Sequence, residues 1–535
     1  MNRHSTAMQE SASWTPLLVG AGRLSAEDVA DVALRSRPVE LSSELAFRRR
    51  IDAGSQAVAA LLSRGQRVYG VNTGYGDSCV VDVPPGLVEE LPLHLLRYHG
   101  CGTGRILDRA ETRAVLLARL VSLAQGYSAV RWQLLEALAA LLNGDVLPRI
   151  PAEGSVGASG DLTPLSYVAA ALVGERDVLW RGTLVPSREA LAGIGLPPLR
   201  LAPKEGLALM NGTAVMTGLA CLAFRRAAGL SRLACRLTAL AVASLRGNHD
   251  HFEPRFFLLK PHEGLWRAAR RIHEDLGGPL AAAREPSAGE GPVQDRYSLR
   301  CAPHVVGVLE DALTWIRRDL ENELNSANDN PLLDPEDGTL FHGGHFYGGH
   351  VAFAMDALKA AVASVADLMD RQLALLVDSR YSAGLPSNLS GATGERSAVS
   401  HGLKGVQIAA SAWTAEALKL TMPAASFSRS TECHNQDKVS MGTIASRDAL
   451  RVLELTEQVA AALALATAQA LELRRRAGTP ARERLSGEAL AFVDSLAATV
   501  PFVEEDTPLD TVLVRLAAEI EAGARPLYPG EDARL

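Results

Sequence analysis

Aromatic side chains are scarce in this chain, and positive charge is not in excess. Phe, Trp and Tyr make up 5% of the 535 residues, and Lys and Arg number 54 against 61 Asp and Glu. The resulting net charge of −7 argues against the basic surface that a nucleic-acid-binding protein usually carries. We therefore expect no nucleic-acid partner.

Metal-type cysteine spacing is also missing. The six cysteines stand at positions 79, 101, 221, 235, 301 and 433, and no two form a C-x-x-C pair. This distribution predicts neither a cysteine-ligated metal nor a secreted disulfide framework. Scattered free thiols suit a reducing compartment, so we expect a cytoplasmic protein.

No hydrophobic run is long enough for a membrane helix. The longest, Val459 to Leu471, has 13 residues, short of the roughly 20 that are needed to cross a bilayer. The first 14 residues mix polar and charged groups, which is not the pattern of a signal peptide. The sequence thus predicts no membrane partner.

Helix-forming residues are abundant instead. Hydrophobic residues reach 47%, and Ala and Leu dominate, which favours helix over sheet. Helical segments are predicted over residues 43–63, 108–143 with a break near Gly126, 205–247, 304–325, 348–377, 399–421 and 442–476. Helices this long, with little strand between them, predict a mainly α fold built on a long central bundle.

The chain divides into four predicted segments. These are a disordered N-terminus (1–20), a smaller, partly extended N-terminal domain (21–204), a central helical bundle (205–480) and a helical end piece (481–535). Within the N-terminal domain, Ser25 and Asp28 predict a capped helix start. Prolines and short apolar runs in residues 176–203 predict extended structure.

The most unusual stretch is the glycine-rich segment GSVGASGD, from Gly154 to Asp161. It matches neither the dinucleotide fingerprint nor a P-loop, so no nucleotide is predicted. Its glycines alone suit a plain tight turn. Such a turn could also bring the amide nitrogen of Gly160 onto the carbonyl carbon of Ala158. Ring closure with loss of water would give an imidazolone, and loss of the Ser159 hydroxyl as a second water would leave an electrophilic exocyclic methylene.

The run GASGDLTPLS, residues 157–166, resembles the signature of the ammonia-lyase and aminomutase family that carries a methylidene-imidazolone group, abbreviated MIO. That family includes histidine, phenylalanine and tyrosine ammonia-lyases. The resemblance extends from about residue 15 to about residue 515 through at least six separated motifs. It implies an MIO formed from Ala158, Ser159 and Gly160, chemistry without a metal, and elimination of ammonia from an aromatic amino acid.

Such an elimination must overcome a poor leaving group and a weakly acidic β-proton. Attack of the substrate amine on the methylene would make the amine a better leaving group, while a base takes the β-proton. The run YGVNTGYG, residues 69–76, resembles the family's lid motif, which makes Tyr69 the implied base. Its phenol, with a reference pKa of about 10, needs neighbouring positive charge or hydrogen-bond donors to act near neutral pH. Tyr75 stands where Phe is common in the family.

The run QDRYSLR, residues 294–300, resembles a second segment of the family. Arg300 is the implied partner of the substrate carboxylate, because a guanidinium pairs bidentately with a carboxylate. The resemblance places Tyr297 near the MIO ring as a secondary proton carrier and Gln294 as a hydrogen-bonding residue of the pocket.

Three shorter segments complete the implied site. Asn211 corresponds to a family residue that contacts the MIO oxygen, although Asn before Gly is also a common turn. Asn328 is an implied contact near the substrate carboxylate, or else part of an Asn-rich turn that Pro331 ends. Phe346 would pack beside the MIO, and His345 replaces the family's usual Asn. No metal site is predicted from the nearby cluster His342, His345 and His350.

Two positions bear on the substrate. The pair Tyr98-His99 lies in a segment that resembles the family's selectivity segment but matches none of its usual pairs. A polar pair can hydrogen-bond a ring hydroxyl, and a site built that way discriminates strongly. Gln436 stands where histidine lyases tend to have Glu, and a neutral amide suits a neutral ring. We therefore expect tyrosine as the substrate, with p-coumarate as its product. Phenylalanine is the second candidate substrate and histidine the third.

Other readings of the same motifs remain open. A tyrosine 2,3-aminomutase would use the same electrophile and return ammonia to the β-carbon. A non-catalytic helical scaffold is disfavoured because the motif residues are intact. By resemblance the protein is a homotetramer whose active sites are each built by three chains.

Overall fold

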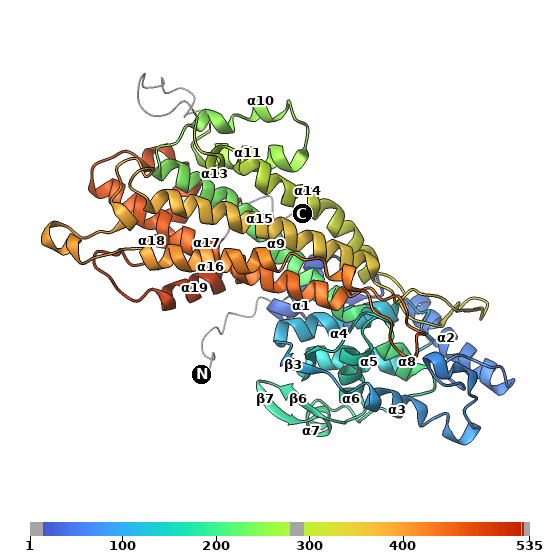
Figure 1. Ribbon diagram of the computed structural model, residues 1–535. Coiled ribbons are helices and arrows are strands. Elements are labelled where there is room, and N and C mark those ends of the chain that lie inside the picture. The colour runs from blue at the N-terminus through green and yellow to red at the C-terminus, as the bar shows by residue number, and fades with distance from the viewer. Residues whose placement is uncertain (1–13, 279–293, 526, 529–535) are drawn as a thin grey trace. The chain divides into compact units, whose positions relative to one another are not determined.

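The computed structural model describes residues 14–278, 294–525, 527 and 528. The described part is mainly α-helical, as predicted (Figure 1). It forms two compact units that are each discontinuous in sequence. Unit 1 combines Met1–Leu222, Asp319–Phe353 and Ala424–Arg447, and unit 2 combines Ala223–Arg318, Ala354–Pro423 and Asp448–Leu535. The four consecutive segments predicted from composition therefore do not coincide with these units.

Unit 1 contains most of the short elements. Its helices are α1 (Ala26–Arg35), α2 (Leu45–Ser63), α3 (Leu91–Tyr98), α4 (Arg109–Ala124), α5 (Trp132–Asn143), α6 (Leu162–Leu172), α7 (Ser187–Gly193) and α8 (Glu205–Met210). The predicted break near Gly126 separates α4 from α5. The predicted start of α1 is confirmed by a capping box, in which the Ser25 hydroxyl accepts from Asp28 N and the Asp28 carboxylate accepts from Ser25 N.

Helix α4 lies at the centre of unit 1. Residues 111–124 are all buried, and the helix packs against α1 and α5. Two arginines, Arg113 and Arg119, are buried within it. Burying an arginine is costly unless its donors are satisfied, and both of these side chains donate to backbone carbonyls within unit 1.

Short strands connect these helices. Strand β1 (Leu17–Val19) pairs in parallel with β2 (Val39–Leu41). The other pairs are antiparallel: β3 (Thr103–Ile106) pairs with β5 (Pro151–Glu153), and β8 (Leu332–Leu333) pairs with β9 (Leu340–Phe341). Strand β6 (Asp177–Trp180) lies between β4 (Val146–Pro148) and β7 (Thr183–Pro186) and pairs with both. The extended structure predicted within residues 176–203 is thus present. The disorder predicted for residues 1–20 is wrong for residues 17–19, because Leu17 and Val19 are buried in a paired strand. Residues 1–13 lie outside the described part.

The helix predicted over residues 205–247 is interrupted. Helix α8 ends at Met210, and α9 (Ala214–Ser244) begins after three non-helical residues. The glycine among them, Gly212, has φ +152° and no room for a side chain, since a Cβ there would overlap Arg119 and approach Asn328. The break therefore reflects packing around residues 211–213, which helical periodicity does not reveal.

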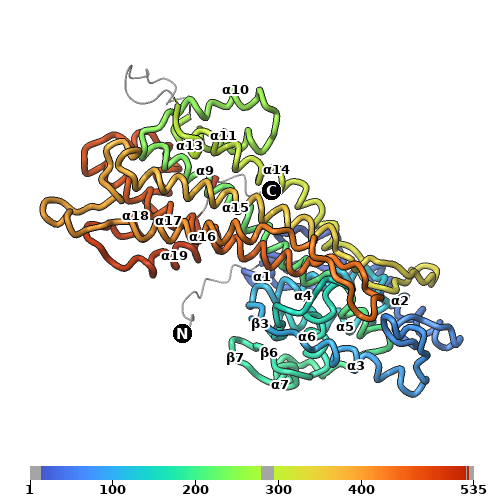
Figure 2. Tube along the Cα trace, viewed as in Figure 1, coloured from blue at the N-terminus to red at the C-terminus, as the bar shows by residue number. Residues whose placement is uncertain are grey.

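Four long helices have residues in both units: α9, α14 (Ala302–Leu324), α15 (Gly349–Val377) and α17 (Gly442–Arg476). Unit 2 adds α10 (Pro254–Phe257), α11 (Glu263–Asp275), α13 (Tyr297–Arg300), α16 (Lys404–Lys419), α18 (Gly487–Ala497) and α19 (Asp510–Ala522). Within unit 2, α15, α16 and α17 run side by side (Figure 2), joined by hydrogen bonds of Ser411 to Asp370 and of Arg451 to Glu416. These helices make up the predicted bundle.

The last predicted segment, residues 481–535, supplies α18 and α19 to unit 2. No helix in the described ranges is long and apolar enough to cross a membrane.

Candidate active site

The glycine-rich loop lies in unit 1, between strand β5 and helix α6. Gly157 and Gly160 have φ values of +66° and +69°, which only glycine adopts readily. Gly160 forms a parallel bridge with Gly212, and a Cβ at Gly160 would overlap the Gly212 carbonyl. Asp161 N donates to that same carbonyl at 2.8 Å. The Ala158–Gly160 turn is thus pressed against the break between α8 and α9.

Asp161 fastens the end of this loop to other parts of unit 1. Its carboxylate accepts from Val215 N and Met216 N, each at 2.9 Å, in the first turn of α9. A carboxylate at a helix N-terminus satisfies free N–H groups and the helix dipole. The other oxygen accepts from the hydroxyls of Thr443 and Ser155. Burial raises the Asp161 pKa to about 6, and these hydrogen bonds oppose that rise.

A third segment holds the loop from the C-terminal side. Met441 N donates to Val156 O at 3.0 Å, and Ser440 Oγ donates to Gly157 O at 3.2 Å. A Cβ on Gly157 would overlap Ser440 Oγ, so the two segments are in direct contact. The loop is therefore held by residues that are far apart in the sequence.

Two predicted site residues contact Ser159. The Asn211 side-chain nitrogen Nδ2 donates to the Ser159 carbonyl at 3.3 Å, and Gln436 Nε2 donates to Ser159 Oγ at 3.2 Å. The Gln436 carbonyl oxygen is fixed by Thr431 Oγ1 at 2.9 Å. Asn211 is 4% exposed, and its Oδ1 is buried without a hydrogen-bond partner among the described residues.

These contacts fit an imidazolone formed from Ala158, Ser159 and Gly160. Attack of Gly160 N on the Ala158 carbonyl carbon would keep the Ser159 carbonyl as the oxygen of the ring, and Asn211 already donates to that oxygen. The hydroxyl that would leave as water is the one that Gln436 contacts. The buried Asn211 Oδ1 has no hydrogen-bond partner among the described residues, so this amide keeps one polar atom available beside the Ser159 carbonyl.

The lid segment lies in the same unit. The Tyr69 hydroxyl oxygen accepts from Gly76 N at 2.9 Å. The backbone of Thr73 forms an isolated antiparallel β-bridge with that of Asp82. The Glu432 carboxylate accepts from Asp77 N at 3.0 Å and holds the lid segment to the region that also carries Gln436. Burial raises the Tyr69 pKa, and the Gly76 N–H opposes that rise because it stabilises the phenolate.

The selectivity pair Tyr98-His99 lies at the end of α3 and close to the lid phenol. The two rings are 4.5 Å apart. Burial, followed by the nearby Tyr69 and Glu432, raises the Tyr98 pKa, although 55% of this side chain is accessible to solvent. Burial lowers the His99 pKa to about 4, so this imidazole is neutral near pH 7. The pair thus offers neutral hydrogen-bonding groups beside the implied base.

Asn328 is placed differently from the sequence prediction. It is 3% exposed, and its Oδ1 accepts from Ser122 Oγ at 2.9 Å, Arg119 Nη1 at 3.2 Å and Thr213 N at 3.4 Å. Its Nδ2 donates to Glu323 O and to Ser326 Oγ. Both ends of the amide are therefore hydrogen-bonded within the chain, and the contact of Asn328 near the substrate carboxylate stays a prediction.

Phe346 and the histidines lie around the start of α15. Phe346 is half-buried, and Gly348, two residues later, packs so closely on Met216 that a Cβ would overlap its sulfur. His345 and His350 lie near the partly buried Glu323. Burial raises the Glu323 pKa, and the hydrogen bond from Thr213, followed by the nearby His350 and His345, opposes that rise. Among the residues that the structure describes, no group of three or more His, Cys, Asp or Glu side chains could hold a metal ion.

The other three predicted residues belong to unit 2. Gln294 is exposed, and Tyr297 is 71% exposed at the first residue of α13. The Arg300 guanidinium lies 4.7 Å from the centre of the Tyr297 ring, and its Nε donates to Asp295 O at 3.0 Å. Tyr297 and Arg300 therefore form a local pair on an accessible part of unit 2.

A family model described as aromatic amino acid lyase matches residues 24–496 of this chain. The chain belongs to the aromatic amino acid lyase family. It is accordingly a carbon–nitrogen lyase by descent, and the expected family and helical fold are confirmed.

Named relatives of this lyase cover nearly its full length. It is 38% identical to histidine ammonia-lyase from Sorangium cellulosum, over 94% of this chain and 96% of the relative. It is also 38% identical to tyrosine ammonia-lyase from Cereibacter sphaeroides, over 88% of this chain and 92% of the relative. The crystal structure of tyrosine aminomutase from Streptomyces globisporus superposes with a TM-score of 0.87 at 34% identity, covering 95% of this chain and 97% of that one.

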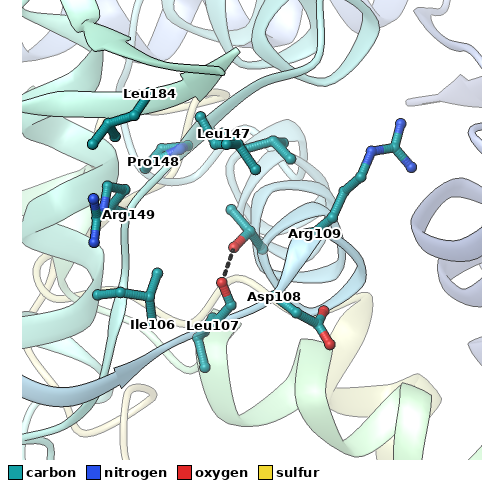
Figure 3. A pocket seen from close by; sticks show the side chains of 10 residues that line it. Ile106, Leu107, Asp108, Arg109, Leu147, Pro148, Arg149 and Leu184 are labelled. Atoms are coloured by element: carbon teal, nitrogen blue, oxygen red, sulfur yellow. Dashed lines mark hydrogen bonds between the residues drawn. The ribbon is translucent and has the colours of Figure 1, made fainter. Parts of the chain in front are cut away.

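Unit 1 of the lyase also contains a pocket of about 210 Å³ (Figure 3). Its lining is mostly apolar and comes from β3, the start of α4, β4, β6 and β7, together with Arg149. None of the predicted site residues lines it. It is therefore not the pocket that the motifs imply.

Sequence reasoning missed several residues that support the lyase's loop. Asp161 and Thr443 carry the hydrogen-bond network, Glu432 holds the lid segment, and Arg119 contacts the backbone carbonyl of Asn211. A signal existed for Arg119, because an arginine within the apolar run from Ala114 to Ala124 of α4 must find buried acceptors. The role of Asp161 could have been suspected from its place in the signature motif itself.

Proposed function

We propose that this lyase eliminates ammonia from L-tyrosine to give p-coumarate, using an MIO formed from Ala158, Ser159 and Gly160. The observation that carries the proposal is the placement of Asn211 and Gln436 on the two oxygens of Ser159. When formed, the MIO would supply an electrophilic methylene for the substrate amine. The chain's own residues then have to hold the substrate, move the β-proton and stabilise developing negative charge.

Asn211 is suited to the last of these tasks. Electron density pushed into the ring would collect on the Ser159 carbonyl oxygen, to which Asn211 Nδ2 donates. A donor fixed in a buried site stabilises such charge without reorganisation of solvent. Asn211 itself is buried, with 4% of its surface exposed, so its amide is held by the surrounding chain.

Tyr69 is suited to take the β-proton. Gly76 N–H donates to its hydroxyl oxygen, which stabilises the phenolate that a base must form. Burial nevertheless raises its pKa, so further positive charge is required for activity near neutral pH. We assign Arg300 to the substrate carboxylate and Tyr297 to proton transfer, in an assembly of four chains with shared sites.

The choice of tyrosine depends on charge at two positions. Gln436 is neutral where a carboxylate would favour the imidazole of histidine. His99 is neutral as well, because burial lowers its pKa to about 4. Together with the Tyr98 hydroxyl it can hydrogen-bond a phenolic ring, whereas a phenylalanine ring would leave these polar groups unpaired. Overall identity does not separate the candidates, since the histidine and tyrosine relatives are both 38% identical.

Offering L-tyrosine, L-phenylalanine and L-histidine separately tests this proposal. Arylacrylate formation is followed by absorbance and the amino acids by chromatography. We expect the highest kcat/KM for tyrosine. A higher kcat/KM for histidine or phenylalanine would refute the substrate, and no ammonia release from any of the three would refute the function.

A tyrosine 2,3-aminomutase is the second candidate, and one contact favours it. The Glu432 carboxylate fastens the lid at Asp77 N, and a lid that stays closed retains the arylacrylate long enough for ammonia to add to the β-carbon. The same chromatograms therefore quantify β-tyrosine. If the mutase reaction operates, Glu432→Gln should weaken a charge-assisted hydrogen bond and raise the ratio of p-coumarate to β-tyrosine. Absence of β-tyrosine from the wild-type reaction would remove this candidate.

A further inference from the structure

Arg119 is the most deeply buried arginine near the active-site loop. It projects from α4, is 0% exposed, and reaches three acceptors. Its Nη2 donates to the backbone carbonyls of Ala208 and of Asn211, the latter at 3.0 Å, and Nη1 donates to Asn328 Oδ1 at 3.2 Å. One side chain thus connects the end of α8, the turn that follows it and the segment around Asn328.

These acceptors define the position of the Asn211–Thr213 turn. Arg119 holds the Asn211 backbone from one side while the Asn211 side chain reaches Ser159 O from the other. Gly212 lies so close to the guanidinium that a Cβ there would overlap Nη1. The carbonyl of this same Gly212 accepts from Asp161 N and bridges Gly160. Arg119 therefore fixes the surface against which the Ala158–Gly160 turn closes.

The free-energy cost of burying the Arg119 guanidinium argues for a specific role of this residue. Burial lowers the Arg119 pKa to about 10, and its Nε remains buried without a hydrogen-bond partner among the described residues. Replacement of buried charges by well-packed apolar side chains is often neutral or stabilising. Stability alone therefore does not explain an incompletely satisfied guanidinium at this place.

We propose that Arg119 is a positioning residue for the MIO: by holding the Asn211–Gly212 peptides against residues 159–161, it aligns the loop for ring closure and aims the Asn211 amide at the ring oxygen. This inference rests on the MIO proposed above. The step that Arg119 promotes is attack of Gly160 N on the Ala158 carbonyl carbon. The Ala158 oxygen takes the amide protons of Gly160 and Ser159 and leaves as one water, and the Ser159 hydroxyl leaves with the Cα proton of Ser159 as a second.

Arg113 offers a matched control in the same helix. It is 2% exposed, and burial lowers its pKa to about 10 as well. It also donates to two backbone carbonyls, Val32 O at 2.9 Å and Leu142 O at 2.8 Å. None of its acceptors belongs to residues 158–161 or 208–213. Substitution of Arg113 thus removes a buried arginine without touching the loop.

The experiment measures ring formation by intact-protein mass, which decreases by two water molecules per chain, and does not depend on turnover. Full-length wild type, R119K, R119M, R113K and R113M are purified as folded protein, and the rate of mass loss is followed after synthesis in a cell-free system. R119K keeps a charge and a donor, so it is the variant expected to fold if R119M does not.

We expect complete maturation of wild type, R113K and R113M. Maturation of R119K should slow on the order of 10²-fold, the effect of misplacing reacting groups by about 1 Å, and folded R119M should keep the unmodified mass. In matured R119K, kcat should fall while KM stays within about twofold, since the misaligned Asn211 acts on the transition state. If folded R119K matures and turns over at the R113K rate, Arg119 has no positioning role. If the wild type itself lacks the mass loss, the MIO proposal fails instead.

Discussion

Truncation of Asn211 separates the chemistry of the site from its stability. In Asn211→Ala the donor at 3.3 Å from the Ser159 carbonyl is lost, and the buried Oδ1 that has no partner is lost with it. Loss of one preorganised donor to a developing oxyanion costs about 2.7–4 kcal/mol in the transition state, or about 10²–10³-fold in kcat. The folded state loses a hydrogen bond worth about 1 kcal/mol but also sheds an unsatisfied polar atom that costs about 1–3 kcal/mol.

We therefore expect kcat for Asn211→Ala to fall about 10²–10³-fold, while the free energy of unfolding stays equal to that of the wild type or rises by up to about 2 kcal/mol. Rates are measured per matured chain, counted by intact mass, and stability is measured by urea unfolding. Asn325→Ala is the control, because this side chain donates to Leu24 O and Glu321 O at 2.8 and 2.7 Å and accepts from Leu24 N, none of them in the loop. It should lose stability and keep kcat. A kcat within about threefold of wild type in Asn211→Ala would refute the oxyanion role.

Three other substitutions test the remaining parts of the site. Ser159→Ala should abolish turnover and the loss of the second water, as intact mass would show; full activity would remove the MIO proposal. Tyr69→Phe should lose turnover while circular dichroism stays unchanged; unchanged turnover would move the base to Tyr297. Because burial raises the Tyr69 pKa and the phenolate is the active form, kcat/KM of the wild type should rise as pH increases above neutral; a profile that is flat from pH about 7 to about 10 would contradict this. Gln436→Glu should shift the kcat/KM ratio towards histidine, measured by competition between substrates, and an unchanged ratio would show that this residue does not read the ring.

Local sequence patterns predicted most of the helices because their signals are local. Apolar periodicity gave α14, α15 and α17 with ends within two residues, and the capping residues of α1 were recognisable from their spacing. The break between α8 and α9 was missed, because it depends on the absence of space beside Gly212. The discontinuous units were missed as well, because helical periodicity does not tell which distant segments pack together.

The site was predictable in its residue types and less so in its connections. The motifs selected Ser159, Asn211 and Gln436, and the structure brings these three into contact. They also selected Asn328, whose amide is instead used by the chain itself. A motif identifies a residue as important, but the direction of its side chain depends on neighbours contributed by other segments.

The sequence by itself determined the family, the helical class and the loop that can condense, because a Gly-Ala-Ser-Gly turn and apolar periodicity act over a few residues. Only the tertiary structure decided what surrounds that loop: the carboxylate of Asp161 on the start of α9, the lid held by Glu432, and the guanidinium of Arg119 behind Asn211. Each of these contacts joins residues separated by more than 50 positions. Their partners are chosen by burial, since a charged group removed from water must find its acceptors or donors wherever the packed chain supplies them.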